Sequence, residues 1–260
     1  MPPGPRPAAP PDLLPGSGED LSLLSGDFRV FQRLDGHRWS LDDLVTAWYA
    51  ASSVTAPARI LDLGCGIGSV LLMLAWRFPE ARLDGVEAQE ISVELLRKSI
   101  VWNGVGERVT VQNADFRQVA FEPVYDLVSG TPPYFIVGDG VESPHVQRGP
   151  CRFEHRGGVE VYLEAMARAL APDGVGALCA AAAHVGRVES AAPPLGLSIV
   201  ARRAVIPREG KPPLINLYRV RRGNYALTDD APLIVRDRAS KFTVEYDEIR
   251  AAMGMPVWPR

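Results

Sequence analysis

A glycine-rich turn that follows a short apolar segment is the clearest candidate for ligand chemistry in the sequence. Residues 60–63 (ILDL) have the composition of a buried strand, and residues 64–68 (GCGIG) lead from it into an apolar helical stretch. Glycines permit tight turns and let a ligand approach the backbone closely. We therefore expect a bulky cofactor to lie against this strand end. The residues expected at the cofactor are Asp62, Gly64, Cys65, Gly66 and Gly68.

The spacing of the glycines indicates the kind of cofactor. The pattern is Asp-x-Gly-x-Gly-x-Gly, which differs from the Gly-x-Gly-x-x-Gly of dinucleotide-binding enzymes. A pyrophosphate needs the N-terminus of a helix as an anion site, whereas S-adenosylmethionine (SAM) has no phosphate and carries a sulfonium. Asp62 at the start of the turn suits the cationic end of that molecule. The turn therefore predicts SAM rather than a nicotinamide cofactor.

Two further acidic residues occupy corresponding positions on the next two predicted strands. Glu87 ends the second strand and Asp115 follows the third. An acid at the first position can accept hydrogen bonds from ribose hydroxyls, and an acid at the second can accept one from the adenine amino group, with Phe116 against the ring. Surface carboxylates are common, so the prediction depends on three acids at three successive strand ends. Ala88, beside Glu87, belongs to the same predicted cofactor site.

A second motif, Thr131-Pro132-Pro133-Tyr134, follows the fourth predicted strand. It resembles the Asn-Pro-Pro-Tyr motif of amino-methyltransferases of adenine and of the related glutamine methyltransferases. The resemblance implies that residue 131 and the Pro132 carbonyl accept hydrogen bonds from the target amino group, and that Tyr134 stacks on a flat substrate. In such a direct displacement the enzyme mainly orients and polarises the acceptor. The structural alternative is that Pro-Pro only enforces a rigid, extended exit from the strand.

The residue at position 131 departs from the family pattern. A threonine hydroxyl is shorter than an asparagine amide and can donate as well as accept. Thr131 can accept one hydrogen bond from an amine, but it cannot reproduce the geometry of the amide. We therefore expect Thr131–Tyr134 to line the substrate pocket, also at the edge of the cofactor, and leave the methyl acceptor open.

The segment before the glycine turn resembles the corresponding segment of bacterial methyltransferases of tRNA adenine. Residues 36–44 contain an aromatic-Ser-x-Asp pattern, which implies that Trp39 and Asp42 lie at the cofactor and that the following helix closes over its methionine end. Residues 153–156 (FEHR) are loosely similar to the Ala-Arg-His-Glu region of that family, which gives His155 a candidate substrate role. The alternatives are core packing for Trp39, a first-turn acid favoured by the helix dipole for Asp42, and a surface position for His155.

Strands and helices must alternate along the chain to position these motifs. Such alternation is typical of a parallel sheet with helices on both faces, and no helix fits between the last two strands, which should form an antiparallel hairpin. We expect a Rossmann-like α/β fold with a seven-stranded, mostly parallel sheet, as in class I SAM methyltransferases. The predicted strands are 28–31, 59–63, 82–87, 109–113, 125–129, 175–182, 198–206 and 214–221, and the predicted helices are 41–51, 70–78, 91–102 and 159–170.

Composition sets limits on the organisation of the chain. Residues 1–18 contain seven prolines and no hydrophobic periodicity, so we expect a disordered tail there and a single methyltransferase domain over 19–260. No apolar run is long enough to span a membrane. Three widely spaced cysteines and four histidines without paired spacing indicate neither a disulfide framework nor a metal site, and this cysteine usage fits the reducing cytoplasm. The oligomeric state stays open.

The charge of the chain is unevenly distributed. The net charge is −3, yet residues 197–223 carry seven basic side chains and one acid. One interpretation is the solvated outer face of two edge strands. The other is a patch that contacts phosphates, in which case this hairpin should flank the pocket mouth together with Arg148, Arg152 and Arg156.

These patterns support one leading hypothesis and two alternatives. The resemblance covers roughly residues 27–250 and implies a SAM-dependent methyltransferase that modifies the exocyclic amine of an adenine in RNA, most readily tRNA. In the first alternative the cofactor is the same and Thr131 marks a small-molecule or protein acceptor. In the second, the protein binds SAM without catalysis.

Overall fold

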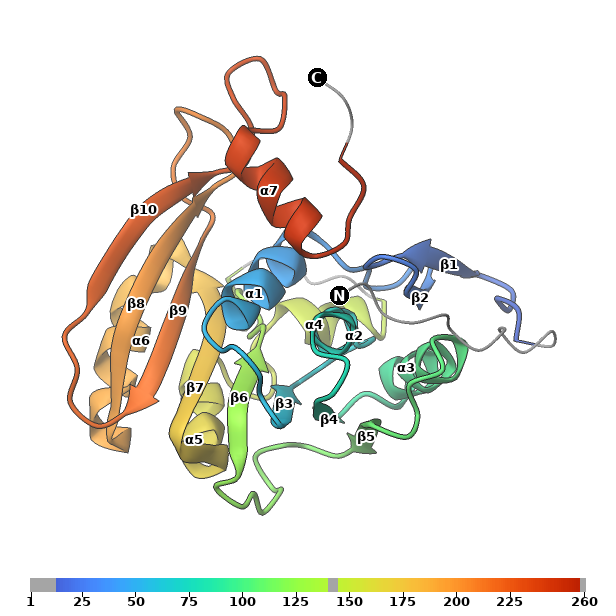
Figure 1. The fold of residues 1–260 in the computed structure, drawn as a ribbon, viewed down its shortest axis with the longest axis horizontal. Helices are drawn as coiled ribbons and strands as arrows, with labels where there is room; N and C mark the ends of the chain where they lie inside the picture. Colours follow the sequence, from blue (N-terminus) through green and yellow to red (C-terminus); the bar gives the residue numbers. More distant parts are fainter. Residues whose placement is uncertain (1–12, 140–144, 258–260) are drawn as a thin grey trace.

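An eight-stranded, mostly parallel sheet forms the centre of the protein, as Figure 1 shows for a computed structural model that describes residues 13–139 and 145–257. The strand order is β10-β8-β9-β7-β6-β3-β4-β5. Strands β3 to β7 run parallel, β9 is antiparallel to β7 and β8, and β10 is parallel to β8. The strands are β3 (Arg59–Leu63), β4 (Arg82–Glu87), β5 (Val109–Asn113), β6 (Tyr125–Gly130), β7 (Leu170–Ala181), β8 (Leu197–Ile206), β9 (Ile215–Arg222) and β10 (Thr228–Ile234).

The expected fold class is confirmed, but the sheet has one strand more than expected. The additional strand is β10, whose sequence TDDAPLI contains a proline and two acids and so lacks the usual signature of a strand. An irregularity in its pairing with β8, between Asp230 and Leu233, accommodates this proline at the sheet edge. Strand β7 begins five residues earlier than expected because a bulge opposite Tyr125 absorbs the Pro-Asp-Gly turn.

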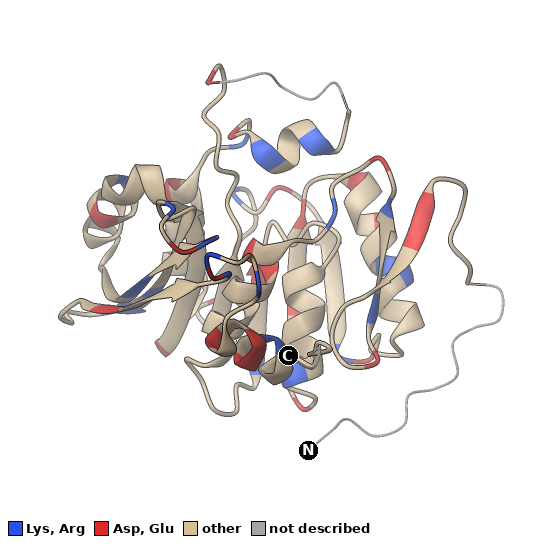
Figure 2. Cartoon of the chain, turned by 90° about the horizontal axis from the view of Figure 1, so that it is seen from above, with Lys and Arg blue, Asp and Glu red and all other residues tan. Residues whose placement is uncertain are grey.

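Helices cover both faces of the sheet (Figure 1 and Figure 2). Helices α1, α2, α3 and α7 pack with one face in a single apolar cluster, and α5 and α6 pack with the other. Along β3 the side chains alternate between the two clusters, with Ile60 in the first and Leu61 in the second. The helices are α1 (Leu41–Ala51), α2 (Ser69–Arg77), α3 (Glu90–Trp102), α4 (Arg148–Arg152), α5 (Val159–Ala169), α6 (Val185–Ala191) and α7 (Val244–Ala252).

A separate antiparallel hairpin of β1 (Glu19–Leu23) and β2 (Arg29–Arg33) precedes α1. It is held on α3 by hydrogen bonds from the Phe31 amide to Ser99 Oγ (2.9 Å) and from the Arg29 amide to Asn103 Oδ1 (2.8 Å). Of the tail expected at 1–18, residues 1–12 lie outside the described part of the chain. Within the remainder, Leu13 packs against the core just before β1.

The parallel arrangement brings four loops to one edge of the sheet. Because β3, β4, β5 and β6 are parallel neighbours, the segments that follow their carboxyl ends lie beside one another. These segments carry the glycine turn, Glu87, Asp115 and the Thr131–Tyr134 motif. Over the described residues, none of the helices has the length and apolar character that a bilayer crossing requires.

Candidate functional site

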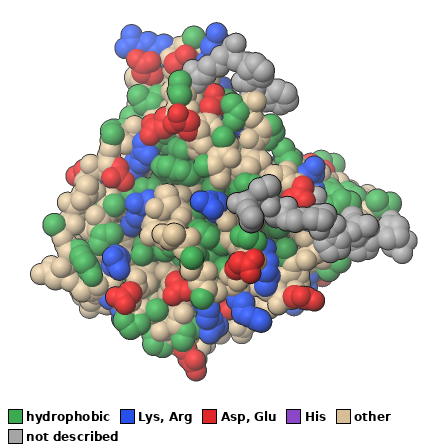
Figure 3. Space-filling view, in the orientation of Figure 1, with side chains coloured by type: hydrophobic (Ala, Val, Ile, Leu, Met, Phe, Trp, Pro, Cys, Tyr) green, Lys and Arg blue, Asp and Glu red, His purple; other side chains and the backbone are tan. Residues whose placement is uncertain are grey.

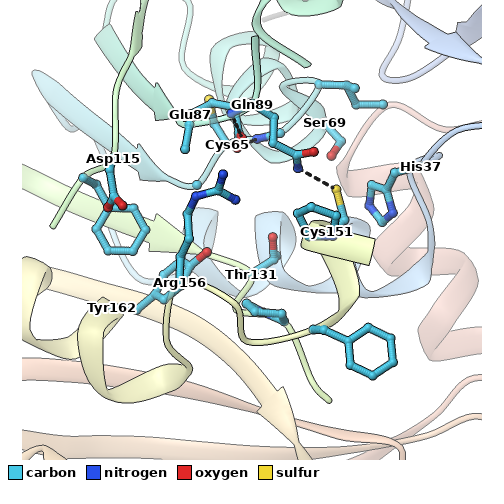
Figure 4. Close-up of a pocket in the computed structure, with 18 of the residues that line it drawn as sticks. His37, Cys65, Ser69, Glu87, Gln89, Asp115, Thr131, Cys151, Arg156 and Tyr162 are labelled. Atoms are coloured by element: carbon cyan, nitrogen blue, oxygen red, sulfur yellow. Dashed lines mark hydrogen bonds between the residues drawn. The ribbon is translucent and has the colours of Figure 1, made fainter. Parts of the chain in front are cut away.

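A pocket opens at this edge of the sheet and collects residues from all four loops (Figure 4). The volume inside it that a water-sized sphere can occupy is about 100 Å³. The residues predicted from sequence that line it are Gly64, Cys65, Gly66, Glu87, Ala88, Asp115, Phe116, Thr131 and Pro133. The predicted residues that do not line it are Trp39, Asp42, Asp62, Gly68, Pro132 and Tyr134.

The glycine turn leaves room for a ligand at one position in particular. Gly66 has a φ of +54°, and a Cβ built on it would meet no other atom within 4 Å. Gly64 also has a positive φ, but a Cβ there would lie 2.4 Å from the hydroxyl of Tyr162. Gly64 is therefore required for packing, whereas Gly66 presents bare backbone to the open pocket.

Glu87 places a carboxylate in the pocket while remaining 6% exposed. It accepts hydrogen bonds from the backbone N–H groups of Gly66 (3.0 Å) and Gln89 (2.6 Å). Burial raises the pKa of Glu87 and outweighs these two hydrogen bonds and the positive charge of Arg156, all of which lower it. A fixed, buried acceptor of this kind is suited to the hydroxyl groups of a ligand.

The far side of the pocket is aromatic and acidic. The ring of Phe116 packs edge-on against that of Tyr162, with 4.7 Å between the centroids. Asp115 lies beside them (Figure 4) and accepts a hydrogen bond from Arg117 Nε at 2.9 Å, an interaction that lowers the pKa of the carboxyl. This side of the pocket can therefore hold a flat ring that carries a hydrogen-bond donor.

Arg156 extends into the pocket from the loop between α4 and α5 (Figure 4). Its charge lowers the pKa of both Glu87 and Asp115. The sequence placed it only at the pocket mouth. Arg187 of α6 fixes the same loop through bonds to Glu154 (2.6 and 2.9 Å) and Glu160 (2.7 Å).

The two adjacent acids of α1 have different surroundings. Asp43, which the sequence did not single out, lines the pocket and is 6% exposed. It accepts a hydrogen bond from the Ser40 amide at 2.9 Å. Burial, with a further contribution from Asp42, raises the pKa of Asp43 to about 8. Asp42 instead accepts a hydrogen bond from the Tyr134 hydroxyl at 2.7 Å, outside the pocket.

Asp62 is enclosed by the sheet and α2 rather than directed at a ligand. It is 2% exposed and accepts hydrogen bonds from Ser129 Oγ (2.7 Å) and from the backbone of Leu71. Burial raises the pKa of Asp62 to about 7. Of the other predicted cofactor residues, Gly68 precedes the first residue of α2 and Trp39 packs against the core.

A second hollow adjoins the pocket and shares His37 and Cys151 with it. Tyr134 and Phe135 lie in this hollow, and Arg152 sits over the Phe135 ring at 5.3 Å. Its other lining residues include Arg38, Asp42, Arg148 and Leu214. Thr131 lines the first pocket and points its hydroxyl into it (Figure 4), and it is not part of the lining of the second hollow.

Other candidate groups lie outside both spaces or form no cluster. His155 is exposed and lines neither hollow. Cys65, Cys151 and Cys179 are free thiols. Within the described ranges, no group of three His, Cys, Asp or Glu side chains is arranged to hold a metal ion.

Sequence comparison relates the chain to methyltransferases. Residues 60–135 match a family profile described as a methyltransferase domain. A tRNA1(Val) (adenine(37)-N6)-methyltransferase of Aeromonas hydrophila is 35% identical over 183 residues, which cover 69% of this chain and 74% of that protein. A protein of the same name from Tolumonas auensis is 31% identical over 74% of this chain and 80% of that one. In other relatives of this name the match spans about half of their length, 53%.

Solved structures of low sequence identity share the fold. A protein described as a predicted O-methyltransferase from Agrobacterium tumefaciens has a TM-score of 0.64 at 20% identity, over 83% of this chain and 98% of that one. An O-methyltransferase of Brevibacillus brevis, solved in complex with S-adenosyl-L-homocysteine, has a TM-score of 0.50 at 14% identity, over 70% of this chain and 72% of that one.

Proposed function

The chain belongs to the family of tRNA1(Val) (adenine(37)-N6)-methyltransferases, and from that premise we propose that it methylates the exocyclic amine of an adenine in tRNA. It is a SAM-dependent methyltransferase. The observation that carries the proposal is that the Thr131–Tyr134 motif contributes Thr131 and Pro133 to the first pocket and Tyr134 to an adjoining hollow with aromatic walls and arginines at its rim. A tRNA substrate implies that the protein works in the cytoplasm.

The residues of the first pocket fit SAM. The bare backbone at Gly66 gives an adenosyl group room against the strand ends. Glu87 accepts hydrogen bonds from the ribose hydroxyls and Asp115 accepts one from the adenine amino group, while Phe116 and Tyr162 pack on the ring. Asp43, at the other end of the pocket, accepts from the α-ammonium. SAM itself supplies an electrophilic methyl carbon on its sulfonium.

The Thr131–Tyr134 motif orients the acceptor. The Thr131 hydroxyl and the Pro132 carbonyl accept hydrogen bonds from the adenine amine, which turns its lone pair toward the cofactor pocket. Tyr134 holds the base in the second hollow, and its own hydroxyl is fixed by Asp42 at 2.7 Å. The base must leave its stack to enter this hollow. Such a direct displacement requires no metal ion.

A matched pair of substitutions at position 131 tests the role of the hydroxyl. Thr131→Val keeps the shape of the side chain and removes the hydroxyl, and we expect kcat for tRNA methylation to fall about tenfold, because one hydrogen bond to the acceptor is lost. Thr131→Ser keeps the hydroxyl and should retain most of the activity. Transfer of labelled methyl from SAM, followed by nucleoside analysis, measures both variants. Full activity of Thr131→Val would remove residue 131 from the acceptor site.

A second candidate keeps the cofactor and changes the acceptor. Thr131 stands where adenine amino-methyltransferases have asparagine, which favours a different acceptor such as a small molecule or a protein side chain. The same labelled SAM, offered to separated tRNA, protein and metabolite pools, decides between the two. Label that enters the protein or metabolite pool and leaves tRNA unmodified would replace our proposal with this one.

A further inference from the structure

The basic side chains on the strands of the β8–β9 hairpin are engaged within the protein. Arg202 bonds to Asp229 at 2.7 Å, and Arg203 bonds to the backbone carbonyl of Ala231 at 2.9 Å. Arg219, Arg221 and Arg222 donate to backbone carbonyls of Tyr49, Asp173 and Leu170. These five arginines tie the hairpin to its neighbours, which favours a structural role for the strands over the phosphate-contacting patch that their composition also allowed.

The two remaining basic residues of the hairpin lie in its exposed turn, beside a second basic loop. Arg208 and Lys211 are exposed between β8 and β9. The loop after β10 lies against this turn, because the Glu209 amide donates to the Arg236 carbonyl at 2.8 Å. We call the exposed basic residues of the two loops the basic crest: Arg208, Lys211, Arg238 and Lys241. Arg236, the fifth basic residue of these loops, is half-buried and donates to the Ser240 carbonyl at 2.7 Å.

The crest differs in charge from the rest of the molecule. Its two loops contain five basic residues and the acids Glu209 and Asp237, a net +3, while the whole chain carries −3. Arg238 pairs with Glu209 at 3.2 Å but remains 82% exposed. Figure 3 shows basic side chains at the top of the molecule, where Figure 1 draws the loop between β10 and α7. The crest is therefore a local positive region on an otherwise acidic protein.

The β8–β9 turn of the crest leads directly into the wall of the acceptor hollow. Ile215 begins β9 and pairs with Ala181 at the carboxyl end of β7, so the β8–β9 turn lies at the same edge of the sheet as the site. Leu214 and Ile215 also line the second hollow, and Leu214 is 55% exposed. Only Pro212 and Pro213 separate Lys211 from that wall. If one base of a nucleic acid enters the hollow, the neighbouring nucleotides would lie next to the crest.

We propose that the basic crest binds the sugar-phosphate backbone of the RNA on the side of the acceptor hollow away from the cofactor. This inference rests on the proposed function, since an RNA substrate gives the crest its partner. Positive side chains on two adjoining loops, next to a hollow with aromatic walls, suit the phosphates of a nucleic acid that places a base in the hollow. Arg148 and Arg152, at the rim of the hollow, would contact the phosphates nearest to the flipped base.

Charge reversal on the crest tests the inference by binding as well as by catalysis. The variant combines Lys211→Glu and Lys241→Glu, both at exposed positions without a described ion pair. The matched control combines Arg82→Glu, at the amino end of β4, with Arg97→Glu on the exposed side of α3, and makes the same change of charge. Binding of tRNA without cofactor is measured at several salt concentrations, next to KM and kcat for methylation. Unchanged melting temperature and SAM affinity show that the crest variant is folded.

We expect the crest variant to bind tRNA at least tenfold more weakly than the control, with a raised KM, an unchanged kcat and a shallower salt dependence. If the wild type methylates tRNA and the two variants bind it equally well, the crest is not the RNA surface and only this inference fails. If tRNA binding depends on the crest but no adenine is methylated, the proposed function fails and the crest stands. Loss of binding to anionic vesicles, with tRNA binding unchanged, would assign the crest to a membrane and overturn the inference.

Discussion

At the scale of single residues, burial decides which carboxyl groups can serve a ligand. Asp62 and Asp43 are both nearly inaccessible, with exposures of 2% and 6%. The carboxylate oxygens of Asp62 already accept hydrogen bonds from Ser129 and from the backbone of α2, whereas Asp43 faces the pocket. Each is held at a pKa well above that of a free aspartate because burial disfavours the charged form. An incoming cation therefore has the most to gain at Asp43.

Proton release tests this assignment of Asp43. With a pKa of about 8, Asp43 is largely protonated at pH 7 when no ligand is bound. A cationic ligand beside it lowers the pKa, so SAM binding near pH 7 should release a proton and should tighten as the pH rises toward 8. Calorimetry in buffers of different ionisation enthalpy measures the release. Asp43→Asn should abolish it and Asp42→Asn should not, and release that persists in Asp43→Asn would show that another group titrates.

The same raised pKa values give a pH dependence to stability. A carboxyl with a raised folded-state pKa stabilises the fold while it is protonated, so this contribution is complete below pH 4 and is lost as the pH rises through about 7 for Asp62 and 8 for Asp43. Both groups therefore lower the free energy of unfolding as the pH rises above 4, which opposes the increase that other carboxyl groups usually give. A bound cofactor would offset this loss at Asp43, because its positive charge stabilises the ionised carboxylate.

At the scale of elements, helix α6 positions a loop of the site, although α6 itself does not line the pocket. Arg187 holds Glu154 and Glu160 together at 2.6 to 2.9 Å and so fixes the segment that carries Arg156. Gly158 lies in this segment, where a Cβ would come within 2.3 Å of the Arg187 guanidinium. The hydrogen bonds and this close packing hold the segment against α6 next to the pocket.

Removal of Arg187 should therefore affect the site more than the overall stability. The side chain is 26% exposed, so Arg187→Ala should cost about 1 kcal/mol or less in unfolding free energy, while SAM binding weakens several-fold as the loop loosens. Arg187→Lys keeps the charge but not the forked geometry and should lie between the two. Hydrogen exchange over residues 153–158 and a SAM titration measure both effects. Equal exchange rates in wild type and Arg187→Ala would contradict the role of this arginine.

At the scale of the whole molecule, β10 and α7, which the sequence did not predict, pack in the same core as the elements that form the pocket. Leu233 of β10 and Ile249 of α7 are fully buried or nearly so, and belong to the same apolar cluster as Leu44 of α1. Tyr49 of α1 also donates a hydrogen bond to Asp230 of β10 at 2.9 Å. We therefore propose that residues 19–260 fold as one unit, as the sequence suggests.

A substitution that creates a cavity in β10, at the edge of the sheet, tests whether the domain folds as one unit. Leu233→Ala should lower the free energy of unfolding by about 2 to 5 kcal/mol, with one cooperative transition that is the same by tryptophan fluorescence and by circular dichroism. The SAM affinity of the folded variant should remain close to that of wild type, because Leu233 lies far from the pocket along the sheet. A separate early transition confined to β10 and α7 would show that the C-terminal part folds by itself.

The sequence by itself determined the order of the elements from α1 to β9 except the short helices α4 and α6, together with the glycine turn and the three strand ends that carry Glu87, Asp115 and Thr131. These features follow from local periodicity and turn chemistry. It could not separate Asp42 from Asp43, since adjacent helical residues point about 100° apart and only packing fixes which faces the pocket. It also could not detect β10, whose proline is tolerated only through its edge position. The tertiary structure likewise decided which basic residues are free, because ion pairs and carbonyl contacts join segments distant in sequence.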